Sequence, residues 1–182
     1  VHETGVVHIV LDTEGESVNA VEGIVQLPVD IVSTAAIHSG SSIVSVWLEK
    51  PALRSPDQIV FSGITPGGFR GDSGALFTIV VRGGSEGIGQ ISLADVQVLR
   101  NDGEGTVVPT TVVDSTISVS KTAPVQAIPV DIDKPEPFQI TLNKSKNAYD
   151  GRHILVYLAQ DKGSGVAYYK VCEGLIAGCV LS

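Results

Sequence analysis

The chain has 182 residues, of which 43% are hydrophobic and 18% are charged. This composition excludes a disordered chain, because it supplies enough apolar surface for a core. The formal net charge is −8, and no cluster of Lys or Arg interrupts it, which argues against a nucleic-acid partner because phosphate binding needs clustered cations. No stretch approaches the roughly 20 apolar residues of a membrane helix, so we expect no membrane span.

Short runs of alternating polarity, separated by turn signals, occupy the first two thirds of the chain. The apolar residues are mostly Val and Ile, which suit a pleated sheet better than a helix. We therefore expect an all-β sandwich with very little helix. The expected strands lie, in chain order, at 7–11, 21–27, 31–37, 44–49, 59–62, 77–81, 91–98 and within 107–119.

The fourth run carries the residues whose direction matters most for function. By alternation, we expect Val44, Val46 and Leu48 to face the core. Ser45, Trp47 and Glu49 are then expected to face outward, and 51–57 to form a loop.

The seventh run changes phase in its middle. Ile91 and Leu93 share one phase, whereas Val96 and Val98 share the other. A slip of one residue turns every later side chain to the opposite face, so we expect a β-bulge near Asp95.

Four prolines lie between 121 and 137, at Pro124, Pro129, Pro135 and Pro137. Proline removes a hydrogen-bond donor and fixes φ, so we expect a semi-rigid linker at 123–137 between domains at 1–122 and 138–182. Beyond the linker we expect about four strands, at 138–142, 154–159, 166–172 and 178–181. That number is small for a complete sandwich.

The two cysteines, Cys172 and Cys179, are spaced as the two arms of one hairpin would be. We expect them to form a disulfide, which would place the chain outside the cytoplasm. The alternative is a pair of buried free thiols.

Several short motifs point to chemistry that the rest of the chain does not support. The Gly-Asp-Ser-Gly sequence at 71–74 and the Thr-Ala-Ala-Ile-His sequence at 34–38 are similar to segments of serine proteases. The histidine segment has an extra Ile, however, and the interval between His38 and Ser73 is too short for a double-barrel protease. We therefore expect no catalytic residues and no enzymatic activity.

Other motifs are also interpreted as structural. The Arg-Gly-Asp sequence at 70–72 is expected to be a turn, and the sequon at Asn143 matters only in a eukaryotic secretory pathway. The four histidines show no metal spacing, so no metal site is expected. The acidic turns at 12–16, 101–104 and 161–164 leave structural calcium open, although such residues also dominate ordinary turns, and no other cofactor is expected.

Five segments between residues 12 and 106 match one protein family in residue type and order. They are Val-Asn-Ala-Val-Glu-Gly at 18–23, Trp-Leu-Glu-Lys-Pro at 47–51, Phe-Ser-Gly-Ile-Thr-Pro-Gly-Gly-Phe at 61–69, Gly-Ala-Leu-Phe-Thr-Ile at 74–79 and Val-Leu-Arg-Asn-Asp-Gly-Glu-Gly-Thr at 98–106. This region resembles the cohesin domains of bacterial and archaeal surface proteins. The resemblance implies a jelly-roll sandwich without an active site.

The segments at 135–138, 149–151 and 160–165 resemble the opening half of an immunoglobulin-like module. The expected fold is therefore a cohesin-like jelly-roll β-sandwich followed by a second, incomplete immunoglobulin-like β-sandwich. The chain has no methionine, almost no residues for the first cohesin strand and none for the module's last strands. We interpret this as a processed or excised piece, or as a sandwich whose missing strands come from elsewhere.

Cohesins bind dockerin modules through one sheet face, so the resemblance implies a protein partner. By alternation, the candidate partner-binding residues are Glu22, Gln26, Ser45, Trp47 and Glu49, although Trp47 could instead belong to the core. We expect an extracellular or cell-surface adhesion or scaffold protein that binds a dockerin-like protein. Two alternatives stay open: a filament subunit that exchanges strands with another copy of itself, and a carbohydrate-binding module.

Overall fold

The computed structural model describes residues 4–121, 132–144, 153–157, 159–161, 163, 165–166, 169–172 and 179–181. These residues form strands and no helix, which confirms the expected all-β fold. The chain divides into two compact units, Val1–Val130 and Asp131–Ser182. The division falls within the stretch at 123–137 where we expect the linker. None of the described residues forms a helix that could cross a membrane.

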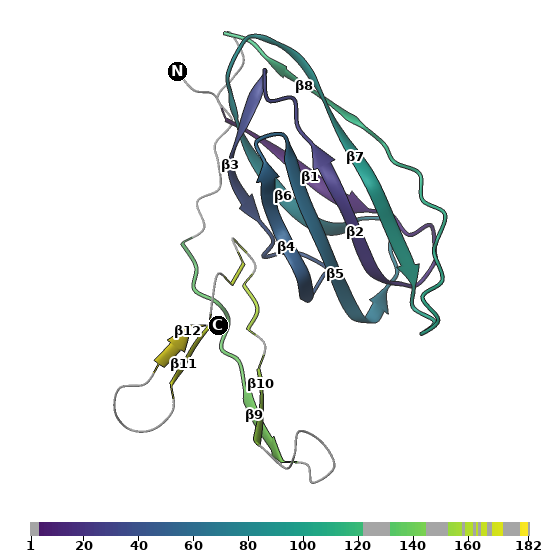
Figure 1. The fold of residues 1–182 in the computed structure, drawn as a ribbon, viewed down its shortest axis with the longest axis vertical. Coiled ribbons are helices and arrows are strands. Elements are labelled where there is room, and N and C mark those ends of the chain that lie inside the picture. The colour runs from purple at the N-terminus through teal and green to yellow at the C-terminus, as the bar shows by residue number, and fades with distance from the viewer. Residues whose placement is uncertain are drawn as a thin grey trace. The chain divides into compact units, whose positions relative to one another are not determined.

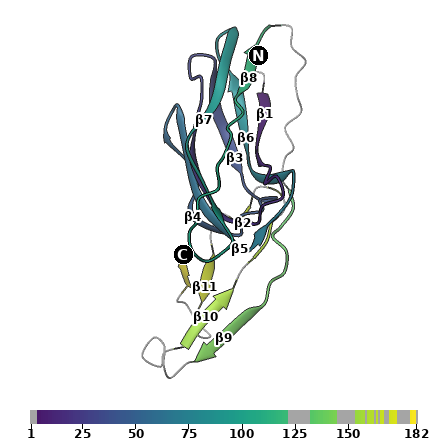
Figure 2. The same ribbon diagram turned by 90° about the vertical axis from the view of Figure 1, so that its right-hand side faces the viewer.

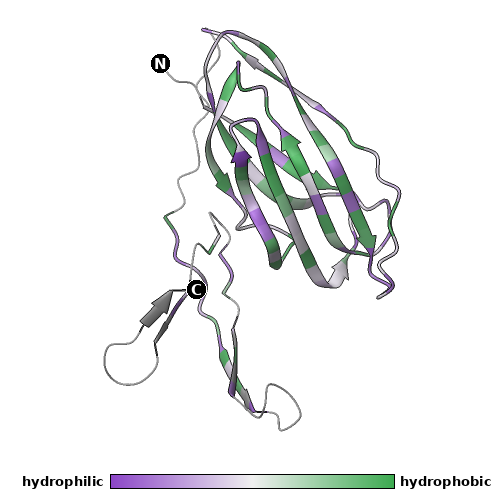
Figure 3. Cartoon of the chain, viewed as in Figure 1, coloured by the Kyte–Doolittle hydropathy of each residue, from purple (hydrophilic) through white to green (hydrophobic). Residues whose placement is uncertain are grey.

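The first unit is a sandwich of two antiparallel sheets (Figures 1 and 2). The three-stranded sheet has the order β1 (Thr4–Leu11), β6 (Gly74–Gly83) and β3 (Val32–His38). The five-stranded sheet has the order β4 (Val46–Ser55), β5 (Gln58–Phe69), β2 (Val18–Gln26), β7 (Gly87–Arg100) and β8 (Ser115–Val119). Apolar and polar residues follow each other along these strands (Figure 3), as a two-faced sheet requires.

The core lies between the two sheets. Val25, Ile59 and Ile79 have no exposed surface, and they come from β2, β5 and β6. Phe61 and Phe77 join the two sheets, with ring centroids 5.0 Å apart in an edge-to-face arrangement. Aliphatic side chains at every second strand position therefore build one continuous core.

The expected phase change in β7 is confirmed. Gln97 pairs with Glu22 and Ala94 with Ile24, so β7 holds one more residue than β2 between these pairs. Asp95 takes a φ of 52°, which marks the bulge. The bulge allows Leu93 before it and Val98 after it to face the same core.

The prediction of a loop at 51–57 is wrong, because β4 continues to Ser55. β4 is an edge strand, with β5 as its neighbour. An edge strand tolerates the missing N–H of Pro51, because one side of its backbone has no ladder to complete.

The second unit contains two short antiparallel ladders in its described residues. β9 (Ile140–Lys144) pairs with β10 (His153–Tyr157), and β11 (Lys170–Cys172) pairs with β12 (Cys179–Leu181). The register places Cys172 directly opposite Cys179. The expected hairpin is therefore present in the backbone, and the disulfide itself stays a prediction.

Candidate functional site

The outer face of the five-stranded sheet, which is the side away from the core, carries side chains in rows across four strands. The strand registers align Val46, Ile64, Ala20 and Leu99 in a first apolar row. Val46 is 39% exposed, and beside it Leu48 is 73% exposed. Burying apolar surface drives association, so an exposed apolar row is a candidate contact site.

A polar row follows directly. It consists of Glu49, Ser62, Glu22 and Gln97, again one residue from each strand. The Ser62 hydroxyl donates a hydrogen bond of 3.3 Å to Glu22, and Glu49 lies 4.0 Å from the Arg54 guanidinium. Both carboxylates are exposed, so the row presents negative charge and hydrogen-bond acceptors to solvent.

A second apolar row and a second polar row complete the outer face. The second apolar row is Ala52, Val60, Ile24 and Ala94, and the second polar row is Ser55, Gln58, Gln26 and Ser92. Val60 is only 5% exposed, although it lies outside the core cluster. Its neighbours on the outer face therefore cover it.

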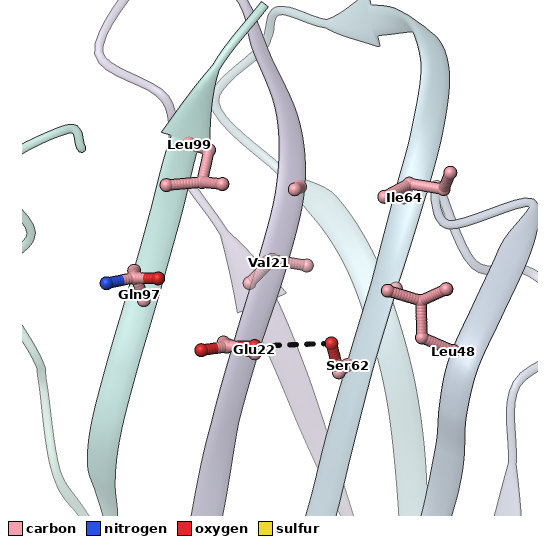
Figure 4. A pocket seen from close by; sticks show the side chains of 9 residues that line it. Val21, Glu22, Leu48, Ser62, Ile64, Gln97 and Leu99 are labelled. Carbon is pink, nitrogen blue, oxygen red and sulfur yellow. Dashed lines mark hydrogen bonds between the residues drawn. The ribbon is translucent and has the colours of Figure 1, made fainter. Parts of the chain in front are cut away.

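A hollow of about 200 Å³ lies where the first apolar row meets the polar row. Its lining includes the small residues Ala20, Ser62 and Gly63. Figure 4 shows the larger side chains of Leu48, Ile64, Leu99, Glu22 and Gln97 around this hollow. The hollow therefore offers an apolar side chain a place on the outer face.

Four of the five expected partner-binding residues are accessible or lie on the outer face. Glu22 and Gln26 belong to β2 and Glu49 to β4, all in outer-face rows. Ser45 is exposed and precedes β4.

The expectation that Trp47 faces outward is wrong. Its side chain is half-buried and packs against the core. The alternation breaks between Val44 and Trp47, because these two residues, three apart, both lie on the core side next to Gly63. A bulge in β4 then returns Glu49 to the outer face. Trp47 pairs with Gly63 and Glu49 with Ser62, so Leu48 is the extra residue between them. Leu48 and Val46, which the alternation placed in the core, are both exposed on the outer side.

Sequence reasoning missed the apolar residues of the outer face. A signal was present, because three of them adjoin a buried residue: Ala20 precedes Val21, Ile24 precedes Val25 and Leu99 follows Val98. Two consecutive apolar residues in a strand place one on each face. That pattern predicts a sheet with apolar groups on both faces.

The protease-like fragments lie in different elements. Ser73 is exposed between β5 and β6, and His38 is the last residue of β3, opposite Thr78. No hydrogen bond joins Ser73 to His38 in the part of the chain that is described. The Arg-Gly-Asp sequence at 70–72 lies in the same connection, where the Gly71 N–H donates to the Thr13 hydroxyl at 3.1 Å.

The acidic turns use their carboxylates to hold their own backbone. Asp12 accepts a hydrogen bond from the Glu14 N–H at 2.8 Å, and Asp161 accepts bonds of 3.0 Å from Gly163 and Gly165. A hydrogen bond from the Thr106 hydroxyl and a weaker contribution from the Glu104 N–H hold the pKa of Asp102 below its ordinary value. Among the described residues, no group of three His, Cys, Asp or Glu could hold a metal ion.

No family model matches the chain, and no curated protein matches it. The geometry of the outer face is therefore the main basis for assigning a function.

Proposed function

We propose that the chain is a non-catalytic adhesion or scaffold protein of the cell surface or extracellular space. In this proposal, the outer face of the five-stranded sheet binds another protein. The cohesin-like sequence segments support the proposal, because cohesins bind their partners through one sheet face.

The observation that carries the proposal is the alternation of apolar and polar rows across four hydrogen-bonded strands. Interfaces between proteins combine an apolar centre with polar groups that fix orientation. Leu48 and Val46 supply exposed apolar surface, and Glu22 lies one row away. Because hydrogen bonds already hold these strands in place, binding requires little loss of backbone conformational entropy.

The charge of the outer face indicates the chemistry of the partner. The first polar row holds two exposed carboxylates, Glu22 and Glu49. A partner that places an aliphatic side chain in the hollow would best place Lys, Arg or N–H donors beside these carboxylates. A dockerin-like protein is the partner that the sequence resemblance suggests.

The carbohydrate-binding alternative has less support. Carbohydrate-binding sites usually stack the sugar ring on exposed aromatic side chains. The four rows contain no aromatic residue. Trp47, the one tryptophan, packs against the core. We therefore prefer a protein partner.

The test compares Leu48→Asp with Val113→Asp, a control at a position that is 82% exposed outside these strands. Each protein is immobilised, proteins of a native cell-surface fraction are captured, and the captured partner is purified for surface plasmon resonance. We expect Leu48→Asp to weaken binding by about tenfold or more, because it places a charge in the apolar contact. Val113→Asp should bind as the unmodified chain does. Equal affinity of Leu48→Asp and the unmodified chain would reject the outer face as the binding site.

A further inference from the structure

The sandwich has four edge strands, and three of them carry features that discourage pairing with another strand. β4 contains Glu49, Lys50, Pro51 and Arg54, and its register with β5 shifts three times. Charges, proline and bulges are the usual protection of an exposed edge. β4 is therefore a poor template for an added strand.

The edges at β8 and β3 are protected in other ways. β8 has only five residues and lies between the charged residues Asp114 and Lys121. β3 holds an extra residue, Ala35, because Thr34 pairs with Val81 and Ala36 with Val80. A short edge or a bulged edge leaves few backbone groups in register for a new partner.

β1 lacks these protections. From Gly5 to Leu11 it contains no Asp, Glu, Lys, Arg or Pro. Its register with β6 also shifts once, but there the extra residue is Leu76 on β6, so β1 itself continues without a bulge. Among the described strands, β6 is the single neighbour of β1, so β1 is a template without a bulge of its own and without Asp, Glu, Lys, Arg or Pro from Gly5 to Leu11.

The sheet that contains β1 is the narrower of the two. Five strands oppose three, and Figures 1 and 2 place β1 on the same side of the sandwich as β7 and β8. Several core-facing side chains on this side are only partly buried: Val7 and Leu11 on β1, Leu93 and Val96 on β7, and Ile117 and Val119 on β8. The core-facing residues of the central strand β6 are fully covered, with Ile79 at 0% exposure.

We propose that the edge of β1 from Gly5 to Leu11 accepts one extended strand from another polypeptide. The strand would be uncharged and would carry aliphatic or β-branched residues at every second position, because these would lie beside Val7 and Leu11, which are only partly buried, and cover them. One added strand would bring the three-stranded sheet closer in width to the five-stranded sheet opposite it. This site lies on the three-stranded sheet and is separate from the outer face proposed above.

The test uses a synthetic probe, the capped peptide Thr-Val-Thr-Val-Thr-Val-Thr, and amide hydrogen exchange of the whole chain. We expect the peptide to slow exchange in residues 5–11. Val10→Lys should weaken peptide binding by about tenfold, because lysine at an edge blocks strand addition. Val10 is 57% exposed, so the variant should fold; Leu53→Lys on β4, at a position 47% exposed, is the matched control and should bind normally.

A second probe does not depend on any change to the protein. Two further peptides have the same sequence but carry N-methyl groups on alternate residues, one peptide along each of its two backbone edges. A methylated edge has no N–H groups and cannot donate hydrogen bonds to β1. One of these two peptides should fail to protect residues 5–11. The proposal is overturned if the unmodified peptide gives no protection there, if protection appears on β3 or β4, or if Val10→Lys binds equally well. Concentration-dependent dimers that protect residues 5–11 without peptide would assign the edge to a second copy and also overturn it.

Discussion

At the scale of single residues, Gly63 controls the junction between the core and the outer face. A Cβ at this position would collide with Val44 and would lie 2.9 Å from Trp47 Cε3 and 3.1 Å from the Val46 carbonyl oxygen. Glycine therefore allows the Trp47 ring to pack beneath β5. The same small residue lines the hollow on the outer side.

Gly63→Ala should destabilise the protein by about 1–3 kcal/mol, because an added methyl group in a tightly packed core forces neighbouring groups to move. Urea unfolding followed by circular dichroism measures the change. Gly5→Ala is the control, since a Cβ there would meet only Val81 at 3.5 Å, an ordinary contact. Equal stability of the two variants would show that Trp47 does not pack as described.

At the scale of elements, the bulge in β7 allows residues on both sides of it to face the same core, although their alternation differs by one position. Asp95 is the residue with positive φ at this point, and Val98 beyond it is 2% exposed. Without the extra residue, the side chains after Asp95 would turn to the other face.

Deletion of Asp95 should therefore cost about 3 kcal/mol or more, because Val96 and Val98 would leave the core. Asp95→Gly keeps the residue count and suits a positive φ, so it should be as stable as the unmodified chain or slightly more stable. Thermal unfolding of both variants checks this pair of expectations. A deletion variant with unchanged melting temperature would contradict the role of the bulge.

The ladder of β11 and β12 gives the disulfide prediction a definite geometry. Directly opposite residues of an antiparallel pair have Cα atoms about 4.5–5.5 Å apart, which a disulfide can span. Because Cys172 pairs with Cys179, we expect no titratable thiol in the denatured, unreduced chain. Two thiols per chain, measured with a thiol reagent on protein from an oxidising compartment, would mean that the bridge is absent.

At the scale of the whole molecule, the first unit carries its own core. The buried core cluster begins at Ile9 and ends at Val98, and the partly buried residues packed against it extend to Val119. All of these residues lie within Val1–Val130. A core contained in one segment of the chain needs no contribution from the rest.

A fragment of residues 1–130 should therefore fold without the second unit. We expect cooperative thermal unfolding and a circular dichroism spectrum typical of β-sheet. The spectrum of a disordered chain would show that the first unit depends on residues after 130.

The sequence by itself determined the all-β class, the positions along the chain of most strands in the first unit and the bulge at Asp95. Each of these follows from which residues along one strand are apolar, and that information is local. The resemblance to cohesins added a partner class that remains a proposal.

Only the tertiary structure decided which face each residue of β4 presents and which edges stay open. Glu49 faces outward although Trp47, two residues before it, faces the core, because β4 holds the extra residue Leu48 opposite β5, and that count depends on the pairing of two strands. The rows of the outer face likewise exist only once β2, β4, β5 and β7 lie in register. Alternation within one strand cannot reveal this, because register is a relation between strands.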